Sequence, residues 1–295
     1  MTAQLLRGKP LSDSLRRELG ARARQLTEDR GTPPHLAIIA IGGDPGSQVY
    51  LRKKLEACRE VGVESTLESL PAAITEAKVW RLISKLGADP DVDGIILDMP
   101  VPVPLDPARL VEAIPAEKDV EGVTAQNLGR LYAQKSWEAI KKAEVLVPCT
   151  ANAIVNLILE AKVPPAGRHA VVVGRSTIVG RPTAHLLSSL DATVTVCHSR
   201  TKDLARYVGD ADILVCALGR AGAVKGSWVK PGAVVADAGI TSAGGQLLGD
   251  VEAGPAAERA AWLTPVPGGV GPLTVTFLLY NTVLAAERRT RKTLG

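Results

Sequence analysis

Short apolar runs alternate with longer amphipathic segments along this chain, and this alternation restricts the fold more than any other feature. Apolar runs of strand length predict buried strands, and the amphipathic segments between them predict helices. Strands and helices in regular succession are typical of an α/β fold with a parallel sheet. The predicted strands cover 36–41, 63–70, 93–99, 170–173, 193–197, 212–218 and 233–238, and the predicted helices 47–61, 75–86, 107–114, 154–161, 178–190 and 273–288.

Two such series predict two domains, which suits a chain of 295 residues. The second series starts after the turn at 148–150. Ser47 and Thr75 open predicted helices with side chains of the kind that cap helix N-termini. The Pro-rich stretch 100–104 predicts an extended loop. No internal repeat is visible.

Composition argues against several other classes of protein. A hydrophobic fraction of 46% with a net charge of +4 fits neither a disordered chain nor a nucleic-acid-binding one. No run approaches the roughly 20 apolar residues of a membrane span, and no apolar leader opens the sequence, so we expect a cytoplasmic protein without membrane contact. The four cysteines lie far apart without metal-ligand spacing, which predicts buried thiols and neither a zinc site nor a disulfide framework.

The segment 171–187 carries the clearest sign of a ligand. An apolar strand ends at Gly174, a polar turn containing Arg175 and Ser176 follows, and a helix begins near Gly180. Such a turn points backbone N–H groups and the positive end of a helix dipole at one spot, which suits a pyrophosphate. The spacing is not G-x-G-x-x-G, so this turn alone does not separate dinucleotide binding from close packing.

The end of the next strand favours NADP over NAD. A NAD site usually has a carboxylate there for the ribose hydroxyls, but this stretch reads Cys-His-Ser-Arg-Thr. Ser199 and Arg200, with Arg175, are suited to hold a 2′-phosphate. In the alternative interpretation Arg200 only faces solvent, before a helix capped by Thr201.

The chain resembles the methylenetetrahydrofolate dehydrogenase/methenyltetrahydrofolate cyclohydrolase family over nearly its whole length. The matching blocks, in order, are 47–63, 93–102, 118–131, 148–158, 174–182, 192–201, 211–222 and 264–274. The resemblance implies a folate-binding catalytic domain of residues 1–147 plus 275–295, to which the last helix returns, and a Rossmann-like dinucleotide-binding domain of residues 148–274. It also implies a homodimer.

By resemblance, NADP takes a hydride from 5,10-methylenetetrahydrofolate, and water then opens the methenyl cation to 10-formyltetrahydrofolate. The first step needs positioning alone, whereas the second must activate water and move protons. The resemblance gives Tyr50 the role of stacking on the folate and Lys54 a role in the hydrolysis. It places Pro267, Gly268 and Gly269 at the folate and Gly174, Arg175, Ser176, Ser199, Arg200 and Ile240 at the cofactor. The spacing of Tyr50 and Lys54 puts both on one helix face, although an amine in so basic a stretch is commonly solvated.

The chain departs from the family pattern at the folate side. Asp98 stands where the family has Gln beside the catalytic lysine, and a carboxylate there favours the ammonium form of Lys54 and hampers its use as a base. Glu121 stands where the family has Asp, which adds about 1.5 Å of reach toward the pterin.

These departures predict an NADP-dependent dehydrogenase with weak or lost cyclohydrolase activity. Three alternatives stay open: a fully bifunctional enzyme, a paralogue for a specialised one-carbon substrate, and a non-catalytic paralogue that binds folate or nucleotide. Glycines retained for a close approach to phosphate argue against the last alternative.

Overall fold

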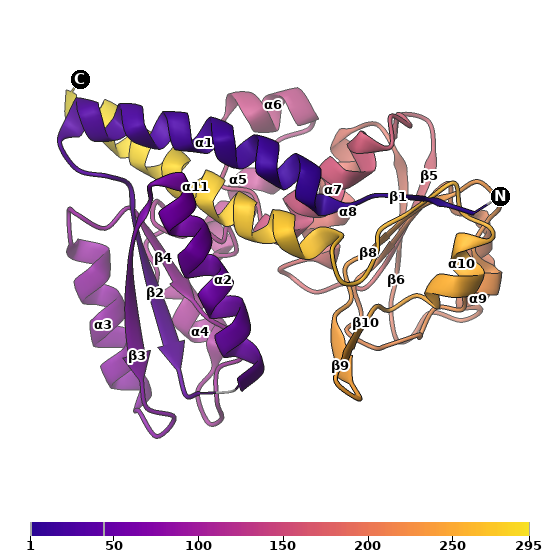
Figure 1. Cartoon of the computed structure of the whole chain (residues 1–295), viewed down its shortest axis with the longest axis horizontal. Helices are drawn as coiled ribbons and strands as arrows, with labels where there is room; N and C mark the ends of the chain where they lie inside the picture. Colours follow the sequence, from indigo (N-terminus) through magenta and orange to yellow (C-terminus); the bar gives the residue numbers. More distant parts are fainter. Residues whose placement is uncertain (1, 44, 295) are drawn as a thin grey trace. The chain divides into compact units, whose positions relative to one another are not determined.

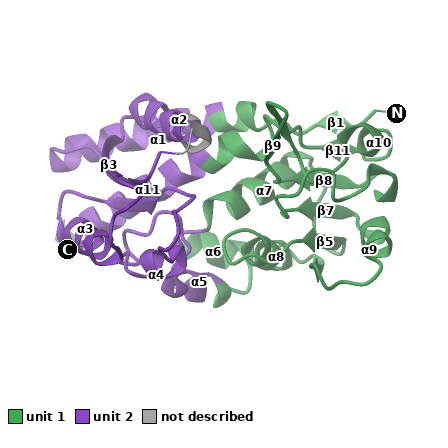
Figure 2. Cartoon of the chain, turned by 90° about the horizontal axis from the view of Figure 1, so that it is seen from below, with its two compact units in different colours: residues 1–12, 132–143, 148–274 green, residues 13–131, 144–147, 275–295 purple. Residues whose placement is uncertain are grey.

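The structure, a computed structural model, describes residues 2–43 and 45–294, and the side chains at 45–47, 49 and 292–294 lie outside this description. The chain forms two compact units (Figure 2). Unit 1 comprises residues 1–12, 132–143 and 148–274, and unit 2 comprises 13–131, 144–147 and 275–295. The two-domain α/β architecture is therefore confirmed.

Unit 1 is built on a parallel sheet with the strand order β1-β11-β8-β7-β5-β6 (Figures 1 and 2). Its strands are β5 (His169–Val173), β6 (Thr193–Cys197), β7 (Ile213–Cys216), β8 (Val234–Asp237), β11 (Trp262–Leu263) and β1 (Gln4–Leu5). Strands β7 and β8 are buried along their whole length, as their continuous apolar sequences predict. The succession reverses at β5, whose neighbours are β6 and β7, and in open α/β sheets such a reversal opens a crevice at the carboxyl ends of the strands.

The helices of unit 1 and one hairpin complete this sheet. They are α6 (Trp137–Lys142), α7 (Cys149–Glu160), α8 (Gly180–Ser189), α9 (Leu204–Asp210), the 3₁₀-helix η1 (Gly226–Trp228), α10 (Ala253–Ala257), and the antiparallel pair β9 (Thr241–Ala243) and β10 (Gln246–Leu248). Both glycines of the hairpin turn, Gly244 and Gly245, have positive φ, which suits a tight two-residue connection.

Unit 2 is built on the parallel sheet β3-β2-β4. Its elements are β2 (His35–Ile41), α2 (Pro45–Val61), β3 (Glu64–Leu70), α3 (Glu76–Ala88), β4 (Gly94–Leu97), α4 (Pro107–Glu112) and α5 (Ala125–Tyr132). Ala37, Ile39 and Ile41 form one core with apolar side chains of α3 and α4. Helix α2 lies on the other side of the sheet from α3 (Figure 1).

The last helix, α11 (Val270–Leu294), belongs to unit 2 from residue 275 onward. The amide of Asn281 donates to the carbonyls of Val120 and Val147 at 2.8 and 2.9 Å. Arg289 also pairs with the buried Asp93 at 3.0 Å. By length and composition this helix is apolar enough to span a membrane, against our expectation, but 72% of that stretch is buried inside the protein, as in the core helix of a folded domain.

Several elements were absent from the sequence-based prediction. Helix α1 (Gly8–Arg30) has no apolar run to mark it, and β1 is too short to detect. Pairing of β1 with β11 adds residues 1–12 to unit 1, and residues 132–143 also belong to unit 1, whereas the predicted boundaries put both segments in the other domain. Thr75 is the N-cap residue of α3 without a side-chain hydrogen bond to the cap, and α2 begins two residues before Ser47, whose side chain lies outside the described part.

The two units also repeat one local arrangement that the sequence did not reveal. In each unit a histidine opens a central strand and donates its backbone N–H, at 3.0 Å, to an aspartate that directly precedes a neighbouring strand. The pairs are His35 with Asp93 and His169 with Asp212. Each imidazole also lies within hydrogen-bond distance of a threonine hydroxyl on the adjacent strand.

Candidate active site

Lys54 and Asp98 meet in unit 2. Lys54 lies on α2, and Asp98 follows β4 directly. The Lys54 amine donates to Oδ1 of Asp98 at 2.5 Å. The Asp98 side chain is 6% exposed and the Lys54 side chain 20%, so water screens this pair poorly. The juxtaposition predicted from the sequence is therefore present, and the amine is held by a carboxylate.

Tyr50 lies one helical turn before Lys54 on the same helix and is partly buried. The amine of Lys53 lies over its ring, 5.7 Å from the centroid, as in a cation–π contact. Burial raises the pKa of the Tyr50 phenol, so it stays neutral at physiological pH. A neutral aromatic ring with a cation beside it suits the stacking role predicted for Tyr50, and that role stays a prediction.

Hydrogen bonds and close packing fix the backbone of the loop that carries Glu121. The Lys118 amine donates to the carbonyls of Leu86 and Asp89 at the carboxyl end of α3, at 3.1 and 2.5 Å. The Asp119 carboxylate accepts three N–H bonds and one O–H bond, from Gly122, Thr124 and Asn127. A Cβ at Gly122, whose φ is +73°, would lie 2.4 Å from the Leu146 carbonyl oxygen. The backbone at Glu121 therefore has little freedom to absorb a longer side chain.

Electrostatics couple Glu121 to the ion pair. Loss of hydration raises the pKa of the Glu121 carboxyl, and the charges of Asp119 and Asp98 add to this rise. Lys54 opposes it. Three acids and one base thus interact here, and Asp98 is the acid at the position where the resemblance led us to expect Gln.

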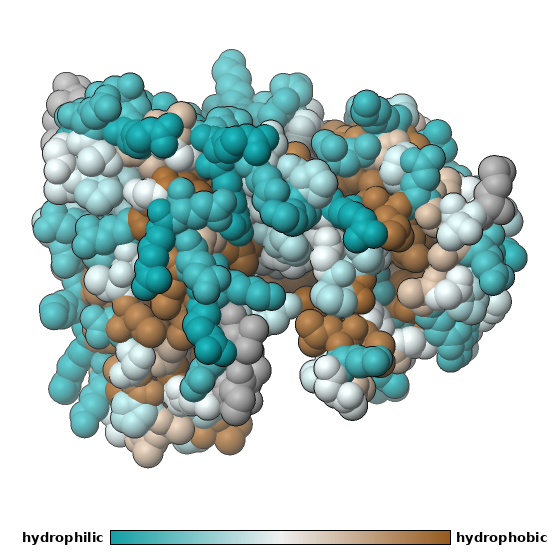
Figure 3. All heavy atoms as spheres, viewed as in Figure 1, coloured by the Kyte–Doolittle hydropathy of each residue, from teal (hydrophilic) through white to brown (hydrophobic). Residues whose placement is uncertain are grey.

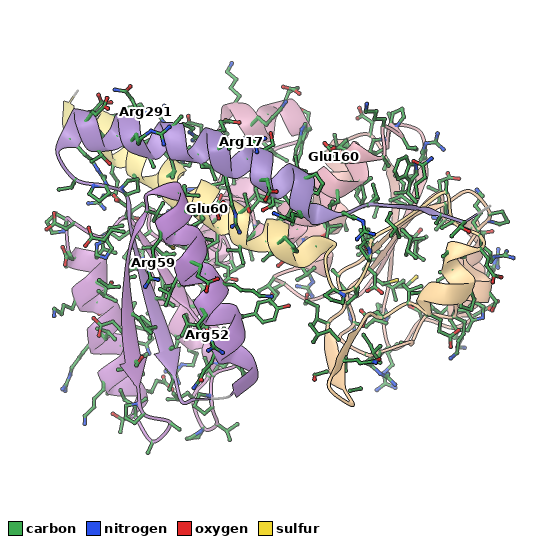
Figure 4. All side chains as sticks on the ribbon, viewed as in Figure 1. Arg17, Arg52, Arg59, Glu60, Glu160 and Arg291 are labelled. Atoms are coloured by element: carbon green, nitrogen blue, oxygen red, sulfur yellow. The ribbon has the colours of Figure 1, made fainter. Side chains whose placement is uncertain are left out.

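A cavity of about 300 Å³ adjoins Asp98 in unit 2. Hydrophobic side chains gather between α2 and the edge strand β3 (Figure 3), and Leu51, Leu55 and Leu67 line the cavity there. Arg52, on α2 (Figure 4), adds a cation to the lining. Of the ion pair, Asp98 lines this cavity and Lys54 does not.

In unit 1, the turn after β5 has the close backbone packing that a phosphate site requires. Gly174 has a φ of +129°, and a Cβ there would lie 2.3 Å from the Ala217 carbonyl oxygen. A Cβ at Gly180 would lie 2.2 Å from the Gly174 carbonyl oxygen. Only glycine fits at these two positions, and both bring the chain close to the N-terminus of α8. The turn is therefore packed closely against the start of α8, and a role for it in binding a dinucleotide phosphate stays a prediction.

Of the polar residues in this turn, Arg175 faces solvent and Ser176 bonds to the start of α8. The Ser176 hydroxyl accepts the N–H groups of Val179 and Gly180 at 3.2 and 3.3 Å, so Ser176 caps the start of α8 and can still donate its own hydrogen. Sequence reasoning missed this capping role.

The turn after β6 holds the other predicted cofactor residues. The side chains of Ser199 and Arg200 are exposed, and Ile240, after β8, is 43% exposed. The Thr201 hydroxyl accepts the His198 N–H at 2.8 Å, which closes this turn. Helix α9 begins at Leu204 with Asp203 as its N-cap residue, so the prediction that Thr201 caps this helix is wrong. The exposure of Arg200 agrees both with a 2′-phosphate site and with the alternative in which this side chain only faces solvent.

Pro267, Gly268 and Gly269 form a tight connection after β11 in unit 1. The peptide bond before Pro267 is cis, and Gly268 has a φ of +107°. The Gly8 N–H donates to the Gly268 carbonyl at 2.9 Å. A part for these residues in folate binding stays a prediction.

Two groups missed from the sequence are the buried carboxylates Asp237 and Asp250. Asp237 ends an apolar strand, and this signal was available in the sequence. Asp250 stands in an irregular segment with no such signal. Among the residues that the structure describes, no cluster of three or more His, Cys, Asp or Glu is placed to hold a metal ion, and all four cysteines are buried.

Comparison with known proteins identifies the chain's relatives. Residues 6–121 match the model of the tetrahydrofolate dehydrogenase/cyclohydrolase catalytic domain, and residues 148–290 match the NAD(P)-binding domain of the same family. The bifunctional protein FolD of Azoarcus sp. is 45% identical over 99% of both chains.

Solved structures agree with this similarity. A methylenetetrahydrofolate dehydrogenase-cyclohydrolase of Trypanosoma brucei, solved with NADP and an inhibitor, has a TM-score of 0.91 at 36% identity over 99% of both chains. A 5,10-methylenetetrahydrofolate dehydrogenase of the silkworm Bombyx mori has a TM-score of 0.89 at 36% identity, covering 98% of this chain and 99% of that one. The chain therefore belongs to the tetrahydrofolate dehydrogenase/cyclohydrolase family.

Proposed function

We propose that the protein is an NADP-dependent 5,10-methylenetetrahydrofolate dehydrogenase in which the cyclohydrolase step is slow. The ion pair between Lys54 and Asp98, at 2.5 Å, is the observation that carries the second half of this proposal. Family membership and the glycine turn at Gly174 and Gly180 support the first half.

The dehydrogenase step demands little chemistry from side chains. Loss of hydride from the methylene carbon leaves a cation that the adjacent folate nitrogens stabilise, so no protein acid or base is needed. NADP, when bound, accepts that hydride on its nicotinamide ring. Tyr50 would hold the folate ring system in place by stacking, and Glu121 would accept N–H donors of the pterin.

Hydrolysis has different requirements. Water must attack the methenyl carbon, and a proton must leave that water as the new C–O bond forms. Lys54 is the basic group of the cluster, and in the ion pair its amine already donates to Asp98. An ammonium ion has no lone pair, so before Lys54 can accept the water's proton it must give up the proton that it shares with Asp98 and move away from that carboxylate. The proton that it takes from the water then passes to the folate nitrogen whose C–N bond breaks. The cost of separating the ion pair is added to the barrier for hydrolysis alone.

The cofactor preference rests on the turn after β6. No carboxylate stands at Cys197–Thr201, and Arg200 and Ser199 are exposed where a 2′-phosphate would bind. The Trypanosoma brucei relative was solved with NADP, which supports the same preference. We also infer a homodimer in the cytoplasm from the family resemblance, and light scattering after size exclusion tests the oligomeric state.

Full bifunctionality is the second candidate, because the curated relatives at 42–46% identity are named bifunctional proteins. One assay separates the two. Purified enzyme receives methylenetetrahydrofolate with NADP or NAD, and formation of the methenyl product is followed. Decay of added methenyltetrahydrofolate is measured separately, with and without enzyme.

Fast NADP-dependent formation with methenyl decay close to the rate without enzyme supports the proposal. Enzyme-dependent decay that keeps pace with formation supports full bifunctionality. Formation that is equally fast with NAD contradicts the cofactor preference.

A further inference from the structure

Two carboxylates buried in unit 1 take no part in the chemistry above. Asp237, at the end of β8, is 3% exposed, and Asp250, between β10 and α10, is fully buried. They are linked, because the Asp250 backbone N–H donates to Oδ1 of Asp237 at 3.0 Å. Burying a carboxylate costs free energy unless it accepts several hydrogen bonds, and each of these two carboxylates accepts three.

Each carboxylate organises a segment of backbone. Asp237 also accepts the N–H groups of Gly239 and Val251, at 2.9 and 2.8 Å, which ties the segment around Asp250 to the end of β8. Asp250 in turn accepts three consecutive N–H groups from the loop after β7: Leu218 at 2.5 Å, Gly219 at 3.2 Å and Arg220 at 2.7 Å. The result is a relay of hydrogen bonds from β8 through Asp250 to the loop after β7.

Two glycines pack closely against the side chains of Asp237 and Asp250. A Cβ at Gly239 would lie 2.2 Å from Cγ of Asp250, and a Cβ at Gly249 would lie 2.2 Å from Oδ2 of Asp237. Burial raises the pKa of Asp237 to about 6 in spite of its three N–H donors. Burial of these carboxylates is unfavourable by itself, and glycine backbone packs directly against them. The hydrogen bonds that they accept therefore determine the shape of the loops that donate to them.

These loops follow β7 and β8, so they lie at the carboxyl edge of the parallel sheet, on the β7 side of the reversal at β5. The loop after β7 borders the phosphate turn, because Gly174 packs against the Ala217 carbonyl. Ser199 and Arg200 follow β6, on the other side of β5. A dinucleotide whose 2′-phosphate binds at Arg200 therefore extends its nicotinamide half over β7 and β8.

We propose that Asp237 and Asp250 are positioning residues for the nicotinamide half of NADP. They hold the backbone of 218–220 and of Gly239 in the shape that receives this half, without touching it. This inference rests on the proposed NADP dependence.

The test separates the two halves of the cofactor. Asp250→Asn and Asp237→Asn each keep the size of the side chain and lose the charge. Asp212→Asn is the matched control, because Asp212 precedes β7 at the opposite edge, where it accepts the His169 N–H and pairs with Lys230. Affinities are measured for NADP and for 2′,5′-ADP, which carries the adenosine half with the 2′-phosphate alone.

For both Asp237→Asn and Asp250→Asn we expect the Kd of NADP to rise about tenfold while the Kd of 2′,5′-ADP stays within about twofold. The control should leave both affinities unchanged even where its melting temperature falls. Unchanged NADP binding, or equal losses for the two ligands, would overturn the inference. A wild-type protein that binds neither ligand would refute the NADP dependence itself, which is a separate result.

A milder variant covers the case in which neither Asn variant folds. The Thr264 hydroxyl accepts the Asp237 N–H at 2.8 Å, so Thr264→Val disturbs the position of Asp237 while its carboxylate keeps all three N–H donors. We expect a loss of NADP affinity of about threefold with 2′,5′-ADP unaffected, and the same two outcomes as above overturn the inference.

Discussion

Replacing Asp98 by Gln tests the central argument, because Gln keeps a hydrogen-bond acceptor near Lys54 and removes the charge. At 2.5 Å the present pair attracts by several kcal/mol at an effective dielectric constant of about 20, and desolvation offsets most of this. What remains is the net strength of a hydrogen bond that involves charged groups, about 1.5–3 kcal/mol. The Asp98 pair, in which both groups are charged, belongs near the upper end of this range, and a Gln acceptor, which leaves only the Lys54 charge, belongs near the lower end or slightly above it.

The difference, about 1–1.5 kcal/mol, is the cost that Asp98 adds to freeing the Lys54 amine. Because 1.36 kcal/mol corresponds to a factor of ten in rate, we expect Asp98→Gln to accelerate methenyl hydrolysis about tenfold. The dehydrogenase rate should change less than about twofold, since hydride transfer uses no base.

The assay measures decay of methenyltetrahydrofolate without nucleotide, and NADPH formation separately. Asp91→Gln is the matched control, because Asp91 is an exposed acid just before β4, at the other end of the strand from Asp98. Hydrolysis in Asp98→Gln that is unchanged or slower, with normal dehydrogenase activity, would refute the reasoning.

Three further predictions concern unit 1. Arg200→Ala should raise the Kd of NADP about tenfold and leave that of NAD unchanged, because a charge-assisted bond to the 2′-phosphate is lost; Arg206→Ala, an equal charge change on α9, is the control, and equal losses for both nucleotides would contradict the assignment. Gly180→Ala should abolish NADP binding and lower the melting temperature by several degrees, because the added Cβ would meet the Gly174 carbonyl. In the control Gly129→Ala, on α5, the added Cβ would meet no neighbouring atom within 4 Å, and the protein should become more stable by up to about 1 kcal/mol. Similar melting temperatures for the two variants would argue against the packing account. Asp237 binds its proton with a pKa of about 6 when folded, against an ordinary value of 3.8, so the free energy of unfolding should fall by on the order of 3 kcal/mol as pH rises from about 4 to about 6. Urea unfolding across that range should show a flatter profile for Asp237→Asn, and a profile parallel to wild type would exclude this titration.

Much of the fold followed from the apolar pattern. The predicted strand 193–197 has the same bounds as β6, and the strand predicted at 233–238 is longer than β8 by one residue at each end. Buried parallel strands are signalled by local runs of Val, Ile and Leu, so periodicity alone finds them. Helix α1 and the hairpin β9–β10 lack such runs: the first is mostly polar and the second is exposed along β10.

For the candidate site, the sequence by itself determined which groups are present: an amine on one helix, a carboxylate after a strand, and glycines in a turn. Only the tertiary structure decided which groups meet, because the contact between Lys54 and Asp98 joins positions 44 residues apart. The same holds for Asp237 and Asp250, whose partners lie in three separate segments. Local propensity reports on neighbours along the chain, whereas a buried charge depends on what folding brings around it, and no local pattern contains that information.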